Sequence, residues 1–417
     1  MTPDQIHENV VRQYREHINP YLAKLMHFAG FGVEVHGEGC TIRDHEGREF
    51  LDFLGGYGVF SLGHRHPEIV AALKDQLDHL PLSGKTFFSG KQAALAEKLA
   101  QLAPDPLQYT FFSNSGAEAV EAALKFAKAT TKRSKIVSTI GGYHGKTIGA
   151  LSTTGREKYR KPFEPLMPGV EFVPYGDLDA AKAVIDSQAA AVIIETVQGE
   201  GGIHIPPAGY LKGLEEAAHA NGALLIVDEV QTGVGRTGKM FGSEHDDLHP
   251  DIMTLAKALG GGAMPIGATM FSQQIADAVF SENPLAHTST FGGNPLACTA
   301  GLKTLEIIER DNLAQRSHDL GERLMTKLRE NVKDLDLVAD IRGQGLMIGV
   351  EFSMDEVGEL VTAQVVKRGV VVAYTLNNPR VIRLEPPLIV TEAQIDQAVE
   401  ALTGAILETQ ELLAAFA

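Results

Sequence analysis

Asp228 and Lys257 are the two residues whose positions best suit catalysis. Asp228 ends an apolar run, residues 223–227, that is typical of a buried strand in a parallel sheet. Open α/β sheets place ligands at the carboxyl ends of such strands, and a carboxylate there is costly without a positive partner. Lys257 follows in an apolar segment that ends at the glycines 260–262. Removing its ammonium from water would lower the pKa and make the amine a nucleophile.

An acid at a strand end and a buried lysine further along the chain together suit pyridoxal phosphate (PLP). The lysine amine can condense with the aldehyde of this cofactor, and the acid can keep its pyridine nitrogen protonated. The pair alone does not establish this, because Asp228 could instead cap a helix and Lys257 could extend to solvent. The other motifs have to distinguish these interpretations.

A phosphate could bind at the start of the helix expected after Ser115. The apolar pair Phe111-Phe112 leads into small polar residues and then into a helix with an alanine-rich apolar face. Ser115, Gly116 and Ala117 begin this helix, whose first turn leaves backbone N–H groups free for an anion. A serine that only caps the helix is an equal alternative.

Two more expected strands end beside residues that could touch a ligand. The strand at 136–140 is followed by a glycine-rich loop with Tyr143 and His144. The tyrosine could stack on a flat ring or pack within its own loop. The next strand ends in Glu195, and the flexible loop after it contains Glu200.

Strands alternate with helices from about residue 105 to 270, which predicts an α/β fold with a doubly wound, mostly parallel sheet. Before it we expect an amphipathic helix over residues 1 to about 30 and a hairpin over 34–53 with its turn at 44–47. After residue 310 the pattern indicates a smaller α+β domain. Its expected elements are a helix at 312–331, short strands around 335–354, a helix near 356–368, a strand at 370–373 and a closing helix at 392–411.

Two motifs suggest chemistry but lack its context. His64 and His66 have no third ligand at metal spacing, so we expect no metal site. Residues 233–238 spell G-x-G-x-x-G, but residues 229–232 separate them from the strand end and no convincing helix follows. Nicotinamide binding is therefore not expected.

The composition is that of a globular protein with more than one domain. The 417 residues are 44% hydrophobic and carry a formal net charge of −16, so neither nucleic acid nor an anionic membrane is an expected partner. The two cysteines, Cys40 and Cys298, lie far apart, as is usual in a reduced compartment. The first residues lack the apolar segment of a signal peptide, and no apolar run approaches the ~20 residues of a membrane helix. We therefore expect a cytoplasmic protein.

These motifs, in this order, resemble those of the class III PLP-dependent aminotransferases, the ornithine and ω-amino acid group. The similarity extends from about residue 30 to 400 and includes Lys257. The matching motifs are residues 113–116, 143–145, 198–202, 228–233, 236–238 and 290–295. Three further segments, residues 258–268, 375–378 and 383–387, resemble the branch of the family that acts on diamines.

The resemblance implies a fold-type I PLP-dependent transferase with a seven-stranded, mostly parallel sheet in its large domain. It implies that residues 1–50 contribute to the small domain and to a dimer. Residues 51–300 would form the large cofactor-binding domain, and residues 301–417 the small α+β domain. The implied protein partner is a second copy of the chain in a homodimer, or a dimer of such dimers.

The resemblance also assigns roles around the cofactor. Lys257 would bond to it covalently, and Asp228 would pair with its pyridine nitrogen. The other implied contacts are His144, Glu195, Val230 under the ring, Gln231 at the phenolic oxygen, Tyr143 on the opposite face, Ser115, Gly116 and the Ala117 amide at the phosphate, and Thr290 from the second subunit. The family usually has threonine where Ala117 stands, so one hydroxyl contact is absent.

Three residues are the implied substrate contacts. Arg383 would bind the carboxylate of a keto acid, and Glu200 would neutralise Arg383 while an amine without that carboxylate is bound. A fixed structural ion pair is the alternative. Tyr57 lies in a glycine-rich loop that would help to select the amine.

The resemblance implies transfer of a primary amino group from a diamine such as putrescine or cadaverine to a 2-keto acid, either 2-oxoglutarate or pyruvate. Alternative donors are ornithine, N-acetylornithine, GABA, β-alanine and long-chain or bulky amines. Lys146 stands where several relatives with dicarboxylate-like substrates carry arginine, which weakens the first two. An aminomutase, racemase or decarboxylase of the same fold is a second alternative. A non-enzymatic homologue is a third, against which the intact Lys257, Asp228 and Gln231 argue.

Overall fold

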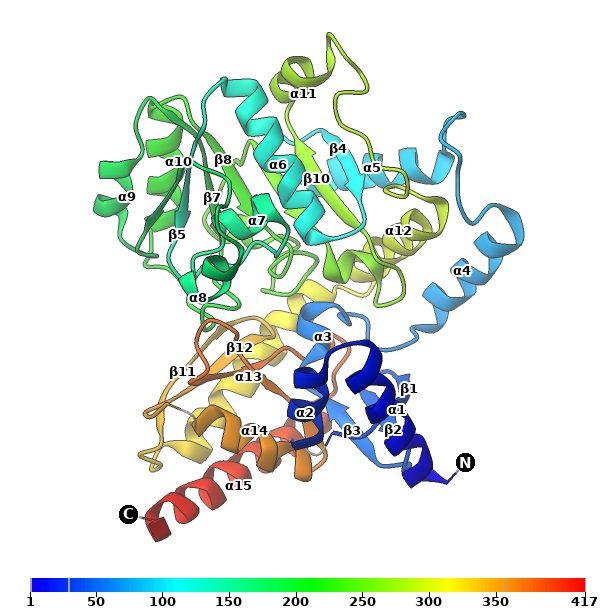
Figure 1. Ribbon diagram of the computed structural model, residues 1–417, viewed down its shortest axis with the longest axis vertical. Coiled ribbons are helices and arrows are strands. Elements are labelled where there is room, and N and C mark those ends of the chain that lie inside the picture. The colour runs from blue at the N-terminus through cyan, green and yellow to red at the C-terminus, as the bar shows by residue number, and fades with distance from the viewer. Residues whose placement is uncertain (1, 29–30, 356, 417) are drawn as a thin grey trace.

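The computed structural model describes residues 2–28, 31–355 and 357–416. A large lobe, built from the middle of the chain, lies above a small lobe that contains both chain ends (Figure 1). Within the described ranges, no helix combines the length and the apolar character needed to span a membrane.

A seven-stranded sheet forms the centre of the large lobe, which confirms the predicted α/β fold. Its strand order is β4-β10-β9-β8-β7-β5-β6; β10 is antiparallel to both neighbours and the other adjacent pairs are parallel. The strands are β4 (Tyr109–Ser113), β5 (Lys135–Thr139), β6 (Val170–Val173), β7 (Ala189–Glu195), β8 (Leu224–Asp228), β9 (Ile252–Leu255) and β10 (Gly267–Phe271). The carboxyl ends of the parallel strands therefore meet at one edge of the sheet.

Helices cover both faces of this sheet (Figure 1). The helices of the large lobe are α4 (Pro67–His79), α5 (Gly90–Leu102), α6 (Gly116–Thr131), α7 (Ile148–Thr153), α8 (Glu157–Arg160), α9 (Leu178–Val184), α10 (Tyr210–Ala220), α11 (Gln273–Phe280) and α12 (Pro295–Arg310), with 3-10 turns η1 (Lys161–Phe163), η2 (Gly242–His245) and η3 (Lys257–Gly260). Of these, α4 packs on α12 rather than on the sheet. In β8, Leu224 and Ile226 pack in the apolar cluster that includes α6, whereas Leu225 and Val227 pack in the cluster that includes α10. Because successive strand residues point to opposite faces, a sheet covered on both sides requires the continuous apolar run seen in the sequence.

The small lobe joins the two ends of the chain in one sheet. Its strands β1 (Glu34–Glu38), β2 (Thr41–Asp44) and β3 (Glu49–Asp52) are extended by β13 (Val370–Val371), which runs parallel to β3. A second sheet has the order β11-β12-β15-β14. Its strands are β11 (Val338–Gln344), β12 (Met347–Phe352), β14 (Ala373–Tyr374) and β15 (Val381–Leu384), and the helices of this lobe are α1 (Pro3–His17), α2 (Pro20–Phe28), α3 (Gly55–Gly58), α13 (Leu313–Val332), α14 (Val357–Lys367) and α15 (Glu392–Phe416).

The prediction of one helix over residues 1 to about 30 is wrong, because α1 and α2 are separate helices. The side-chain oxygen of Asn19 accepts hydrogen bonds from the backbone N–H of Tyr21 (3.0 Å) and of Leu22 (3.2 Å), which caps the second helix. Pro20 lacks the N–H that a continuous helix would need. Residues 1, 29, 30 and 356, which fall within expected helices, lie outside the described residues. The predicted turn at 44–47 is confirmed between β2 and β3.

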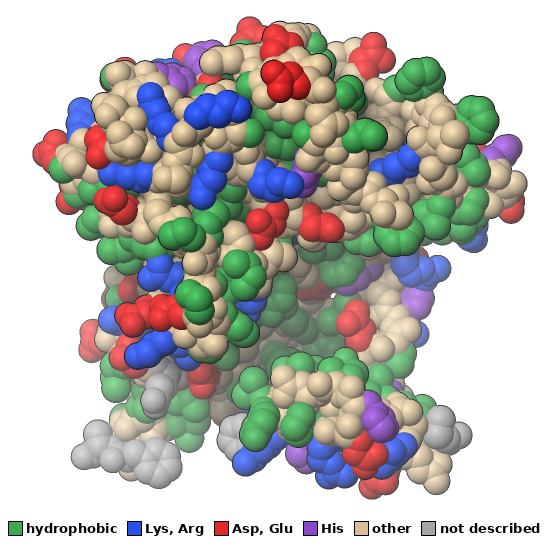
Figure 2. Space-filling model, turned by 45° about the horizontal axis from the view of Figure 1, so that its top comes forward, with side chains coloured by type: hydrophobic (Ala, Val, Ile, Leu, Met, Phe, Trp, Pro, Cys, Tyr) green, Lys and Arg blue, Asp and Glu red, His purple; other side chains and the backbone are tan. Residues whose placement is uncertain are grey.

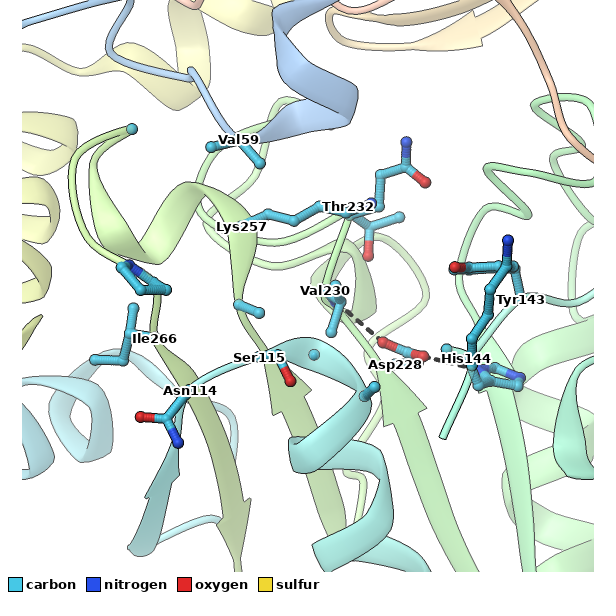
Figure 3. A pocket seen from close by; sticks show the side chains of 18 of the residues that line it. Val59, Asn114, Ser115, Tyr143, His144, Asp228, Val230, Thr232, Lys257 and Ile266 are labelled. Carbon is cyan, nitrogen blue, oxygen red and sulfur yellow. Dashed lines mark hydrogen bonds and ion pairs between the residues drawn. The ribbon is translucent and has the colours of Figure 1, made fainter. Parts of the chain in front are cut away.

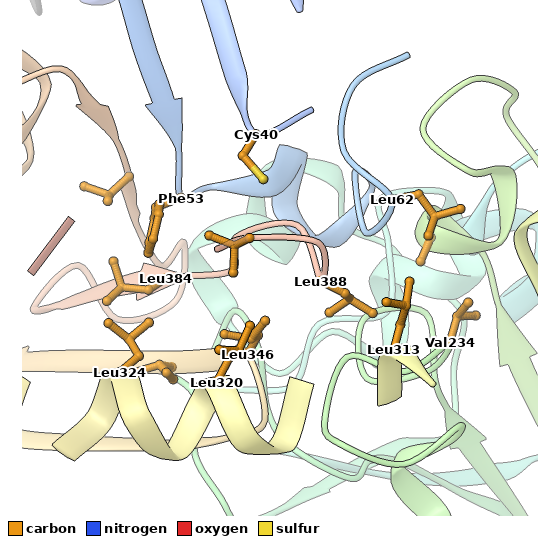
Figure 4. Close-up of a cluster of buried hydrophobic side chains, with 14 of the residues drawn as sticks. Cys40, Phe53, Leu62, Val234, Leu313, Leu320, Leu324, Leu346, Leu384 and Leu388 are labelled. Atoms are coloured by element: carbon orange, nitrogen blue, oxygen red, sulfur yellow. The ribbon is translucent and has the colours of Figure 1, made fainter. Parts of the chain in front are cut away.

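One apolar core connects the two lobes. It brings together Phe53 after β3, Val234 after β8, Leu324 in α13 and Leu384 in β15 (Figure 4). On the face shown in Figure 2, a hollow lies between the lobes, with hydrophobic side chains along its inner surface. The two lobes are thus held together by packing while leaving space between them.

Arg236 crosses the same boundary with a polar side chain. It is only 1% exposed, and its guanidinium donates to the carbonyl oxygens of Leu346 (2.9 Å) and Pro386 (2.6 Å) and to the hydroxyl of Ser61 (3.1 Å). Burial lowers its pKa. These bonds fix the chain next to Pro386, which carries residues of the candidate site.

Candidate active site

The carboxyl ends of β7, β8 and β9 border a cavity of about 520 Å³, a size that suits a small-molecule ligand (Figure 3). The strand register places Glu195 opposite Asp228 and Asp228 opposite Thr254. Across the cavity, Ser115 lies at the start of α6 and Lys257 extends from the first residue of η3. The predicted acid, lysine and helix start therefore face one space.

Three hydrogen bonds hold the carboxylate of Asp228. One oxygen accepts from His144 Nδ1 (2.6 Å), and the other accepts from the hydroxyl of Thr254 (3.0 Å) and the backbone N–H of Val230 (3.1 Å). Burial alone would lower the pKa of His144, but its bond to Asp228 outweighs burial and raises it. The ring therefore favours its charged form more than a free imidazole does, and the charged ring strengthens its hydrogen bond to the carboxylate.

Glu195 is a second buried acid beside Asp228. Its carboxylate accepts hydrogen bonds from the backbone N–H of Tyr143 (2.9 Å) and of Gly199 (3.2 Å), so it fixes the loop that carries the tyrosine. Burial is the main reason that the pKa of Glu195 is raised to about 7. Folding consequently disfavours its ionisation.

This raised pKa predicts a dependence of stability on pH. The stability associated with Glu195 is present below its unfolded pKa of 4.5 and is lost as the pH rises through about 7. We expect Glu195→Gln to remove part of that loss, because the amide cannot ionise. Scanning calorimetry compares Glu195→Gln with the unchanged protein, both without cofactor. Between pH 5 and pH 8, the Tm of the variant should fall by a few °C less than that of the unchanged protein. An equal fall in both proteins would contradict this account.

Lys257 has the reactive character that the sequence predicted. Burial lowers its pKa, although the carboxylates of Glu385 and Glu200 oppose this effect. Its backbone has a φ of 42°, in the left-handed region that is uncommon for residues other than glycine. Within the described ranges its amine takes part in no hydrogen bond or ion pair, so it is free to react.

The first turn of α6 provides a place for an anion. Ser115 caps the helix by accepting from the N–H of Glu118 (3.2 Å), and the N–H groups of Gly116 and Ala117 have no acceptor within the helix. A Cβ added at Gly116 would come within 2.9 Å of a methyl group of Val230. A glycine there lets the helix start lie directly against the cavity wall, with its N–H groups and positive end of the dipole uncovered.

Glu200 and Arg383 form a buried ion pair near this cavity. Burial alone would lower the pKa of Arg383 and raise that of Glu200, but their pairing outweighs burial, so the pKa of Arg383 is raised and that of Glu200 lowered. The guanidinium carbon also lies 5.1 Å from the centre of the Tyr57 ring. Arg383 Nε and Nη1 have no hydrogen-bond partner among the residues that the structure describes. The arginine thus keeps donors available for another carboxylate.

Comparison with known proteins identifies the family. Residues 30–406 match the family described as aminotransferase class-III. The protein belongs to this family. The class-III aminotransferases are PLP-dependent, and this protein is an aminotransferase. Its expected substrates are a small-molecule amine and a keto acid.

Solved structures of similar proteins agree with this assignment. The ornithine aminotransferase from Toxoplasma gondii ME49 is 34% identical, with 91% of each chain covered and a TM-score of 0.86. An amine transaminase from an uncultivated Pseudomonas species, solved in a PLP-bound form, is 32% identical over 91% of this chain and 95% of its own, with a TM-score of 0.86. An (S)-enantioselective omega-transaminase from Thermomicrobium roseum is 31% identical over 96% of this chain and 98% of its own, with a TM-score of 0.91.

The cavity of this class-III aminotransferase fits PLP. A phosphate matches the uncovered N–H groups at the start of α6, and a protonated ring nitrogen matches the carboxylate of Asp228. The unbonded amine of Lys257 matches the aldehyde of the cofactor. The donor set thus provides an anion site, a carboxylate and an amine around one cavity.

The structure brings most of the predicted site residues to the cavity. Those that line it are Ser115, Gly116, Ala117, Tyr143, His144, Glu195, Asp228, Val230, Gln231 and Lys257. Tyr57, Glu200 and Arg383 form their own cluster, and Thr290 is exposed and does not line the cavity.

Sequence analysis missed two residues that touch the site. Glu385 is fully buried, and both of its carboxylate oxygens accept from Gln231 Nε2, at 2.7 and 3.0 Å. In the sequence, Glu385 stands within the motif at 383–387, and its position after an apolar strand and before two prolines is its only signal. Thr254 holds Asp228, and a hydroxyl in the apolar strand β9 was the only sign of it.

Proposed function

We propose that this class-III aminotransferase moves a primary amino group from a diamine, such as putrescine or cadaverine, or from a related ω-amine to 2-oxoglutarate or pyruvate. The observation that carries the proposal is the buried pair of Glu200 and Arg383. The three segments that resemble the diamine branch, and putrescine aminotransferase in particular, support the same donor. We propose a cytoplasmic location, which the net charge of −16 suits.

The ion pair suits two substrates of which only one carries a carboxylate. A diamine has no carboxylate, so Arg383 stays neutralised by Glu200 while the amine reacts. Pyruvate carries one carboxylate and 2-oxoglutarate carries two, and one of these can replace Glu200 and also accept from Arg383 Nε and Nη1. Because an unpaired buried charge is costly, the exchange requires an acid that can move aside.

Lys257 and Asp228 have the proposed catalytic roles. When bound, PLP withdraws the electrons left behind as a proton leaves the amine-bearing carbon. Lys257, whose pKa is lowered by burial, can accept that proton as a neutral amine and later return one. Asp228, held by His144 and Thr254, presents its carboxylate at the place proposed for the ring nitrogen.

The remaining cavity residues have proposed binding roles. Ser115, Gly116 and Ala117 would hold the phosphate, and Gln231 would contact the phenolic oxygen. Tyr143 and Val230 would enclose the ring from opposite faces, with His144 and Glu195 positioning Asp228 and the Tyr143 loop. Tyr57, beside Arg383, would help to select the amine.

A homodimer is proposed because exposed apolar residues flank Thr290. Phe87 and Phe88 are almost fully exposed, and Lys85 ties their loop to that of Thr290 by donating to the carbonyl of Gly292 (2.6 Å). In the proposed dimer these loops meet the second copy, and Thr290 reaches the phosphate site of its partner. Light scattering of the PLP-loaded protein tests this, since a monomer would exclude the shared site.

Ornithine is the second candidate donor, because the relative from Toxoplasma gondii, at 34% identity, is an ornithine aminotransferase. Ornithine carries a carboxylate as well as a primary ω-amine. It would therefore need a partner for that carboxylate during the first half of the reaction, whereas putrescine would not.

A single half-reaction separates the candidates. The PLP-loaded enzyme is mixed with putrescine, cadaverine, ornithine or GABA, without keto acid, and the yellow absorbance of the bound cofactor is followed. We expect the fastest loss with a diamine, followed by recovery when 2-oxoglutarate or pyruvate is added. Loss only with ornithine or GABA would replace the diamine proposal.

A further inference from the structure

The connection between β14 and β15, residues 375–380, lies against the Glu200–Arg383 pair. We call these residues the strap. Part of the strap belongs to the motif at 375–378, which the proposed function leaves unexplained. The strap leads directly into β15, the strand that carries Arg383.

The strap binds Glu200 at two points. The backbone N–H of Leu376 donates to Glu200 Oε2 (2.9 Å), which is the same oxygen that Arg383 contacts. The backbone N–H of Asn377 donates to the carbonyl oxygen of Glu200 (2.8 Å). The carboxylate of Glu200 is therefore shared between the arginine and the strap.

The large lobe holds the strap from its other side. The carbonyl oxygen of Leu376 accepts from the hydroxyl of Tyr159 (3.1 Å) and from Arg156 Nη1 (3.3 Å). The side-chain amide of Asn377 donates to the carbonyl oxygen of Gly141 (2.8 Å). These bonds fix the position of the Leu376 N–H relative to the large lobe.

The strap is also braced internally. The hydroxyl of Thr375 donates to the carbonyl oxygen of Asn378 (2.7 Å). The backbone N–H of Thr375 donates to the carbonyl oxygen of Val381 (2.9 Å). A movement of Leu376 alone would have to strain this turn. The Leu376 N–H is thus a rigid donor rather than one that can follow a moving carboxylate.

We propose that the strap sets how readily Glu200 leaves Arg383, with Tyr159 and Asn377 as positioning residues. The inference rests on the proposed exchange of Glu200 for a substrate carboxylate. When Glu200 moves aside, the half-buried Leu376 N–H loses its acceptor, and losing that hydrogen bond is unfavourable. Removing a hydrogen bond that Tyr159 or Asn377 makes between the strap and the large lobe lets Leu376 shift. The shift lowers this penalty and favours the state in which Arg383 binds the substrate carboxylate.

The inference predicts the direction of an affinity change. Glutarate has two carboxylates but no keto group, so it binds without reacting, and calorimetry of the PLP-loaded enzyme measures its Kd. We expect Tyr159→Phe and Asn377→Ala each to lower this Kd, and the KM for 2-oxoglutarate, by about 2- to 10-fold, as for the loss of one hydrogen bond. The rate constant with the diamine should change by a smaller factor. A simple loss of structure would instead weaken glutarate binding.

Tyr109→Phe is the matched control, because it removes a tyrosine hydroxyl that donates to Gln273, away from the strap. The inference is overturned if Tyr159→Phe and Asn377→Ala bind glutarate only as tightly as this control, or more weakly. Glu200→Gln tests the underlying exchange separately: it should tighten glutarate binding and slow the diamine half-reaction. If Glu200→Gln changes neither glutarate binding nor the diamine half-reaction, the proposed role of the Glu200–Arg383 pair fails. If it changes both, while Tyr159→Phe and Asn377→Ala bind glutarate like the control, only the strap inference fails.

Discussion

Lys257→Ala should lose turnover by roughly 10³-fold or more, because the variant lacks both the amine that bonds to PLP and the group that moves the proton. Steady-state assays with the donor found in the half-reaction measure this loss. The cofactor should also leave the variant on dialysis, since no side chain bonds to it covalently. Cofactor release can be followed by absorbance independently of activity.

Lys182→Ala is the control for this variant, because Lys182 is exposed on α9 and distant from the cavity. It should retain both activity and cofactor. Melting curves of the two variants establish that each is folded. Repeated turnover by Lys257→Ala at a comparable rate would remove Lys257 from the mechanism.

Asp228→Asn should reduce kcat/KM by roughly 10²- to 10⁴-fold, although it changes the shape of the side chain little. A neutral amide cannot balance a protonated ring nitrogen, so PLP should also bind more weakly. The bond to Asp228 raises the pKa of His144, so that pKa should fall in the variant. NMR titration of His144 in the cofactor-free protein measures this fall without reference to activity.

Asp251→Asn is a matched control at the opposite end of the same strands. The carboxylate of Asp251 lies 2.9 Å from His219 Nε2 and accepts from the backbone N–H of Leu225 (2.8 Å). It is thus also an aspartate paired with a histidine, but it precedes β9 and is remote from the cavity. Reduced stability with normal kcat/KM is expected. A similar loss of activity in both variants would indicate general damage to the sheet.

The central sheet could be predicted because its signal is local. The apolar run before Asp228 identifies a strand covered on both faces, and the polar residue at its end identifies the ligand edge. The antiparallel direction of β10 has no such signal, since Gly267–Phe271 is equally apolar in either direction. The break after α1 depended on one asparagine cap before Pro20, which helical periodicity alone did not show.

The site was predictable where one segment carries its own chemistry. Asp228 and Lys257 followed from strand ends and burial, whereas Arg383 and Glu200 were assigned only through resemblance. The bond between Gln231 and Glu385 joins segments far apart in the chain, and no local pattern reports such a contact. The roles of these site residues, and the domain boundaries at residues 50/51 and 300/301, stay predictions.

The parallel pairing of β3 with β13 has a consequence for synthesis. About 320 residues separate the two strands, so the ribosome needs roughly 15 to 65 s after β3 before it delivers β13. Until then the outer edge of β3 has no strand to pair with, and an open edge invites association with other chains. The first strands that leave the ribosome therefore wait for almost the whole polypeptide before their own chain can cover this edge.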